Sequence, residues 1–290
     1  MRRESDPGRR GVLLWFFLAL FGGAMVLGPL IYLALHRWVP FHRAMDRALL
    51  ISALAALGLA WPRLRFREWW PPGRRAWIDA LLGLLVAFVT VQTIVSLDFG
   101  CGGLAWATLA SHVRTRVITT AVIAALLVPP AEETIFRGFL QTEFSRRLGA
   151  RAGWLLVALL FAVAHFIKIP DSLDQKPVHV WSGVTAMGAA FGPVVQGWFL
   201  GWKGANLLIL GLILGGVFRR TGTLWFNEGL HAGLILGLLL TSGLTRPTHA
   251  SFWTGDDVLS SPLTAIVLAV LGWWLWRYYR RPPEAGSTVR

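Results

Sequence analysis

The sequence predicts an all-α polytopic membrane protein with about eight transmembrane helices and with both termini in the cytoplasm. Three observations lead to this fold class: an apolar composition, apolar runs of membrane-spanning length, and basic residues placed between those runs. Hydrophobic residues make up 55% of the 290-residue chain, and only 15% are charged. Soluble domains carry charge on about a quarter of their residues. The mean hydropathy of +0.56 therefore excludes an ordinary soluble domain.

The apolar runs follow one another with short loops between them. A bilayer crossing takes about 20 largely apolar residues. Runs that meet or approach this length cover 12–35, 46–61, 77–97, 117–144, 152–169, 223–241 and 262–279. The region 183–218 is open to two interpretations: two short spans broken at Gly201–Gly204, or one long span preceded by an interfacial or re-entrant segment. The count is therefore eight or nine. The run 12–35 follows an Arg-rich start but is too long for a signal peptide, which favours a retained helix.

The basic residues choose between the two counts. Eight spans with the N-terminus inside place 18 Lys and Arg in the cytoplasm and 8 outside, whereas nine spans give 14 and 13. The positive-inside rule favours eight. The net charge of +13 flanks apolar runs instead of forming one stripe, which indicates the lipid bilayer and not nucleic acid as partner. Residues 1–290 are expected to form a single membrane domain. Arg far outnumbers Lys, which indicates a GC-rich genome and a bacterial inner membrane.

Two carboxylates and a guanidinium lie inside the apolar run 117–144. Ionisable groups at such depth are costly unless paired or hydrated, and they are functional candidates. Glu133 and Arg137 stand at i,i+4 in the order that favours a helical ion pair, and Glu132 points about 100° away around the helix. One Glu is therefore expected to be structural and Glu132 to be nearly free. Pro129-Pro130 is expected to disrupt the helix one turn earlier and to leave a wet pocket beside Glu132.

Two histidines lie in other apolar runs, His165 after Phe161 and His231 after Asn227. A lone His in a membrane helix is often a packing residue. The depth of these histidines in the membrane, compared with that of Glu132, favours a functional role instead. At the helical rise, Glu132, His165 and His231 lie about 21, 21 and 17 Å from the Arg that marks the cytoplasmic end of each run. A carboxylate and two imidazoles at one depth can activate water or ligate a metal.

Other chemistries have weaker support. The chain has no H-E-x-x-H, and the one Glu-x-x-His pair, Glu228 and His231, lacks the second pair that a di-iron site needs. Metal is therefore the minority interpretation, and no cofactor is expected. No nucleophile elbow surrounds Ser182 or Ser242. The single Cys101 excludes an intrachain disulfide.

Three short motifs together resemble the CAAX-protease and bacteriocin-processing (CPBP or Abi) family of glutamic intramembrane proteases. They are Glu132-Glu133-x-x-x-Arg137, Phe161-x-x-x-His165, and Thr221-Gly222-x-Leu224-Trp225 followed by His231. The resemblance places a catalytic core at 117–241. It implies that Glu132, assisted by His165, activates water for attack on a peptide carbonyl. It also implies that Glu133 and Arg137 brace the helix while His231 stabilises the oxyanion, with Phe161 supporting the site.

In the family's pattern an Asn often follows four residues after His231, and here that position is Ile235. Asn227 lies one turn before His231 on the same helix face and is a possible substitute donor. The resemblance implies an intramembrane endopeptidase acting on a membrane-associated protein or peptide. Two alternatives stay open: a non-catalytic membrane partner or immunity protein that retains the fold, and a metal-dependent membrane hydrolase.

Overall fold

The computed structural model describes residues 11–60, 66–248 and 251–279. They divide into two compact units, each built from two stretches of chain: Met1–Leu64 with Val163–Trp198, and Arg65–Ala162 with Phe199–Arg290. We call these unit 1 and unit 2 and describe each by itself. The single domain over 1–290 and the core at 117–241 stay predictions. The terminal segments 1–10 and 280–290, for which the sequence predicts a cytoplasmic location, lie outside the described residues.

Unit 1 is helical. Its elements are α1 (Val12–Phe17), η2 (Leu18–Gly22), α2 (Gly23–Leu35), α3 (Phe41–Ala60), η5 (Asp171–Gln175), α9 (Ser182–Ala190) and α10 (Gly192–Val195). The first three form one continuous helix over Val12–Leu35 with a π-helical turn inside it. Helix α2 packs against α3 and α9. The core between them contains Ala24, Phe41, Met45 and Met187.

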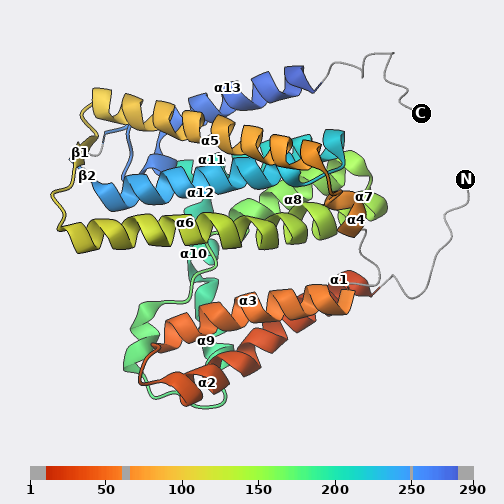
Figure 1. The fold of residues 1–290 in the computed structure, drawn as a ribbon. Helices are drawn as coiled ribbons and strands as arrows, with labels where there is room; N and C mark the ends of the chain where they lie inside the picture. The colour runs from red at the N-terminus through yellow and green to blue at the C-terminus, as the bar shows by residue number, and fades with distance from the viewer. Residues whose placement is uncertain (1–10, 61–65, 249–250, 280–290) are drawn as a thin grey trace, which may run out of the picture. The chain divides into compact units, whose positions relative to one another are not determined.

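Unit 2 holds the remaining long helices (Figure 1). Its elements are α4 (Phe66–Trp69), α5 (Arg74–Gly100), β1 (Leu104–Trp106), α6 (Ser111–Glu133), η4 (Thr134–Gln141), α7 (Thr142–Leu148), most of α8 (Ala150–Ala164), α11 (Trp202–Thr221), α12 (Trp225–Leu244), β2 (Thr245–Pro247), η7 (Val258–Ser260) and α13 (Pro262–Tyr278), with η6 (Trp198–Leu200) at the boundary between the units. Strands β1 and β2 pair antiparallel, with Leu104 opposite Pro247. This short ribbon is the one departure of the described chain from the predicted all-α class.

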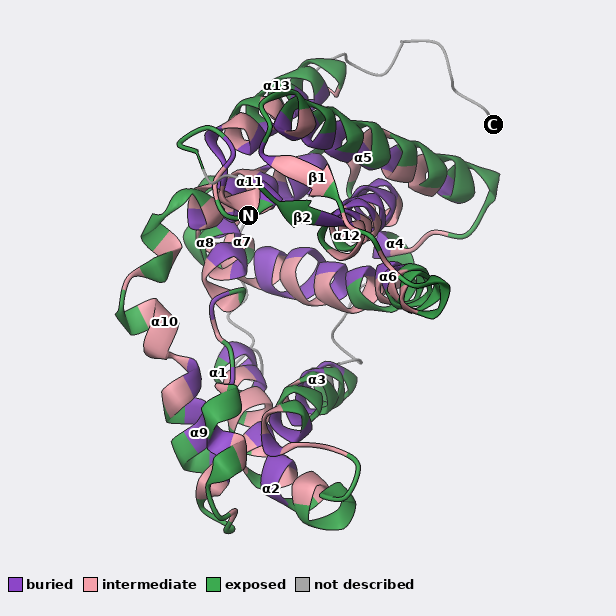
Figure 2. Cartoon of the chain, turned by 90° about the vertical axis from the view of Figure 1, so that its left-hand side faces the viewer, coloured by how far each residue is buried: buried purple, intermediate pink, exposed green. Residues whose placement is uncertain are grey.

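Helix α12 lies at the centre of unit 2 and is largely buried, whereas the outer faces of α5 and α13 are exposed (Figure 2). It packs against α5 and α6. The contact with α5 is close because Gly83 and Gly229 bring the two backbones together: a Cβ at Gly229 would overlap the carbonyl oxygen of Ala80. Small residues allow such close approach between membrane helices. The apolar outer faces, with Leu85 and Leu126 largely exposed, suit contact with lipid.

Four helices of the described chain are long and apolar enough to cross a membrane: Val12–Leu35, Arg74–Gly100, Ser111–Leu148 and Trp202–Thr221. The chain is therefore an integral membrane protein. The count of eight spans and the orientation of the termini stay predictions. Of the two interpretations of 183–218, the structure has one long helix, α11, preceded by the short helices α9 and α10. The run 152–169 is shorter than predicted, because α8 ends at Ala164.

The basic residues of unit 2 gather where the positive-inside argument groups them. Arg74 and Arg75 begin α5, Arg146 and Arg147 end α7, and Arg219 and Arg220 end α11. These helix ends lie at the same end of the unit (Figure 1). The β1–β2 ribbon lies at the opposite end. We call the first the basic end of unit 2.

Candidate active site

The two adjacent acids lie where α6 passes into the π-helical segment η4. The prediction that Pro129-Pro130 disrupts the helix before the acids is wrong: α6 runs through both prolines to Glu133, and the irregularity comes afterwards, over Thr134–Gln141. An interior proline lacks its own N–H, so the helix loses donors without having to end. The Thr134 hydroxyl donates to the Pro130 carbonyl oxygen at 2.7 Å. Departures from α-helical bonding of this kind are frequent at functional sites.

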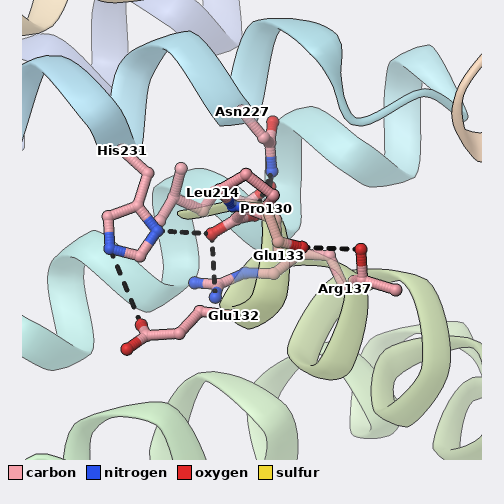
Figure 3. Close-up of polar contacts among 8 residues, drawn as sticks. Pro130, Glu132, Glu133, Arg137, Leu214, Asn227 and His231 are labelled. Carbon is pink, nitrogen blue, oxygen red and sulfur yellow. Dashed lines mark hydrogen bonds and ion pairs between the residues drawn. The ribbon is translucent and has the colours of Figure 1, made fainter. Parts of the chain in front are cut away.

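Glu133 is the centre of the polar cluster (Figure 3). Its side chain is fully buried. The Nη1 of Arg137 lies 3.2 Å from Oε1, which also accepts a hydrogen bond from Nδ1 of His231 at 2.9 Å. Oε2 accepts from Nδ2 of Asn227 at 3.2 Å. The ion pair that the i,i+4 spacing predicts therefore forms, but the same carboxylate also holds two side chains of α12.

His231 lies between the two acids. Because Nδ1 donates to Glu133, the neutral ring has its lone pair on Nε2. Nε2 lies 3.7 Å from Oε2 of Glu132, which is longer than a hydrogen bond and is a separation at which a bridging water is to be considered. The imidazole is buried and packs edge-on against the ring of Phe161, with centroids 5.9 Å apart. Its ring orientation is therefore set by a carboxylate on one side and an aromatic ring on another.

Glu132 differs from its neighbour in exposure and in partners. Its side chain is 29% exposed, against none for Glu133. Its Oε2 is itself buried and accepts no hydrogen bond among the described residues. The sequence-based expectation of one bound and one nearly free carboxylate agrees with these contacts. Its catalytic role stays a prediction.

Arg137 is enclosed by aromatic rings. Its guanidinium carbon lies 4.2 Å from the centroid of Phe161 and 5.7 Å from that of Phe136, and the two rings pack edge to face at 5.3 Å. The side chain is 1% exposed. Buried arginine is stabilised by aromatic faces as well as by its carboxylate partner. Phe161 thus supports both the guanidinium and the imidazole from α8.

Asn227 is fully buried. Its amide nitrogen donates to Oε2 of Glu133 and, at 2.7 Å, to the carbonyl oxygen of Leu214 on α11. Both amide hydrogens are therefore engaged inside the protein. The predicted use of Asn227 as a substitute oxyanion donor would need one of them to be released. The Leu214 carbonyl is a backbone group, and no sequence signal pointed to it.

His165 is the first residue after α8 and belongs to unit 1, whereas Glu132 and His231 belong to unit 2. Its predicted place beside them stays a prediction. In the described part of the chain no group of three or more His, Cys, Asp or Glu side chains is arranged to hold a metal ion.

The turn that leads into α12 explains the third motif. Gly222 adopts φ +70°, a left-handed conformation that ends α11. The backbone N–H of Leu224 then donates to the Trp69 carbonyl oxygen at 2.9 Å, and the Trp225 indole donates to the Pro71 carbonyl oxygen at 2.8 Å. These bonds fasten the start of α12 to the end of α4 and to the segment that follows it, which fixes where Asn227 and His231 enter the cluster.

Fold and site together define a helical membrane protein with a buried cluster of two carboxylates, a guanidinium and an imidazole. Residues 114–237 match the Rce1-like family model, described as type II CAAX prenyl endopeptidase Rce1-like. This match confirms the family that the three motifs predict, and at the family level it indicates a CAAX-type intramembrane protease. Neither curated proteins nor solved structures give a match to the chain.

Proposed function

We propose that this protein is an intramembrane endopeptidase that hydrolyses a peptide bond of a membrane-associated protein or peptide with a water activated by Glu132. The observation that carries the proposal is the contrast between the two acids. Glu133 is buried and saturated with partners, whereas Glu132 is partly exposed and directs an unpartnered oxygen toward His231. A base must reach both water and substrate, and only Glu132 meets that condition.

The chemistry follows from this arrangement. Glu132 accepts a proton from the water as its oxygen attacks the carbonyl carbon, and the tetrahedral oxyanion forms. The proton then passes to the leaving amine as the carbon–nitrogen bond breaks. His231 can donate to the oxyanion from Nε2 only in its doubly protonated form, because its Nδ1 proton is held by Glu133. Family resemblance assigns His165 to assist the attack.

Glu133, Arg137, Asn227 and Phe161 are positioning residues in this proposal. Glu133 sets the tautomer of His231, as the buried carboxylate does in a Ser-His-Asp triad. Asn227 fixes the second carboxylate oxygen and ties it to α11. We therefore assign Asn227 to the orientation of Glu133, and not to the oxyanion. The oxyanion site then lacks the donor that Ile235 replaces.

The test compares Glu132→Gln with Glu143→Gln. Glu143 lies in α7, where it forms an ion pair with the exposed Arg146 at 2.6 Å. Glu143→Gln therefore makes the same chemical change as Glu132→Gln, but outside the polar cluster. Each variant replaces the native gene in the host, and the membrane proteome is searched for C-terminal segments that remain uncut. We expect uncut substrate with Glu132→Gln only. Full cleavage by the Glu132→Gln protein, present at the native level, would refute the mechanism.

A further inference from the structure

A groove lies between α8, α11 and α13 at the basic end of unit 2. Its volume is about 480 Å³, within the range of small-molecule binding sites. Apolar side chains of the two longer helices form its floor, among them Leu212, Ile213 and Leu268. The candidate active site uses none of these residues. The groove is therefore a separate feature that needs its own explanation.

The rim of the groove combines arginine with indole. Arg219 lies with its guanidinium carbon 5.0 Å from the ring centroid of Trp154, and Arg220 lies 5.5 Å from that of Trp276. Arg220 also donates to the Trp276 carbonyl oxygen at 2.8 Å. Stacking on Trp154 occupies one face of the Arg219 guanidinium and leaves its in-plane N–H groups for an acceptor. Arg219 is exposed and has no carboxylate partner within the described ranges.

This arrangement indicates what the groove binds. Trp and Tyr side chains concentrate where a membrane helix meets the headgroup layer, and Trp273, Trp276 and Tyr279 all border this groove. The Arg219 guanidinium beside an apolar groove matches a phosphate that is joined to an acyl chain. Basic pockets between membrane helices suit anionic headgroups. A soluble anion has no apolar part that would contact the apolar floor of the groove.

We propose that this groove binds an anionic phospholipid, with the phosphate held by Arg219 beside the positive charge of Arg220 and an acyl chain lying along α11 and α13. The site is distinct from the polar cluster around Glu133. Lipid binding there does not depend on proteolysis, so the proposal stands or falls apart from the proposed function.

Three variants test the site. Arg219→Gln removes one guanidinium. Gly216→Leu fills the groove without changing charge: a Cβ at Gly216 would meet only the Trp154 ring, at 3.7 Å, so the extra atoms extend into the cavity. The control, Arg114→Gln, makes the same charge change near the start of α6, at the opposite end of unit 2.

The purified full-length protein in neutral detergent is titrated with phosphatidylglycerol, with phosphatidylcholine and with inorganic phosphate. Bound lipid is counted by native mass spectrometry. We expect saturable binding of phosphatidylglycerol that Arg219→Gln weakens by about 10-fold or more, the effect of losing a strong charged contact. Gly216→Leu should weaken it as well, because its side chain occupies the space of the acyl chain. Arg114→Gln should bind like the native protein.

Three outcomes would overturn the proposal. The first is equal affinity for phosphatidylcholine, which would mean that the arginines do not read the headgroup. The second is displacement of the lipid by millimolar inorganic phosphate, which would make the site one for free anions. The third is native binding by Gly216→Leu, which would show that the groove holds no acyl chain. Since Gly216→Leu keeps both arginines, it remains informative even if an arginine variant fails to fold.

Discussion

Breaking the ion pair between Glu133 and Arg137 should destabilise the protein strongly, and the two losses should not add. The pair has side chains that are 0% and 1% exposed. Removal of one partner from a buried pair leaves an uncompensated charge and costs about 3–5 kcal/mol. Replacement of both by neutral residues of similar size avoids that charge. We therefore expect Glu133→Gln and Arg137→Met each to lower the free energy of unfolding by several kcal/mol, with about 2 kcal/mol of coupling between them.

The measurement is reversible unfolding in mixed micelles by SDS titration, followed by tryptophan fluorescence. A second cycle on the same helix, Glu143→Gln with Arg146→Met, is the control. That pair is short, at 2.6 Å, but the Arg146 side chain is 43% exposed. Its coupling should stay below about 1 kcal/mol, as for surface pairs. If the Glu133 cycle shows no more coupling than the Glu143 cycle, the assignment of a buried structural pair is refuted.

Three further predictions follow from other contacts. Gly229→Ala should lower stability by at least about 1 kcal/mol, because its Cβ meets the α5 backbone; an unchanged SDS midpoint would contradict this. Ile235→Asn should raise the cleavage rate about 10-fold or more if His231 faces the oxyanion; a lower or unchanged turnover number argues against that role. Burial raises the pKa of Asp257, but the hydrogen bond and charge of Lys203 and the hydrogen bonds of Ser260 lower it further, below its ordinary 3.8. The ionised Asp257 therefore adds under about 1 kcal/mol to the free energy of unfolding at neutral pH, and this stabilisation is lost as the pH falls below about 4. Asp257→Asn should remove that acid dependence from the unfolding curve.

Contacts within one helix were accessible from the residues alone. The spacing of Glu133 and Arg137 specifies the pair, since residues four apart on a helix face each other whatever surrounds them. The same spacing places Asn227 and His231 on one face of α12. Their shared partner was not accessible, because 98 positions separate His231 from Glu133 in the chain. The continuous helix through Pro129-Pro130 was likewise missed, because proline lowers helix propensity without dictating where a supported helix ends.

By itself, the sequence determined that this is a membrane protein with two acids deep in an apolar helix. Composition and local periodicity carry that information, because they depend on residues close together in the chain. Tertiary structure alone decided that His231 and Asn227 both bond to Glu133, and that the other ring nitrogen of His231 faces Glu132. This arrangement depends on how α12 seats against α5 and α6, through close backbone contacts such as the one at Gly229. The groove at the basic end has the same origin, since its arginines and indoles come from three helices that meet only in the fold.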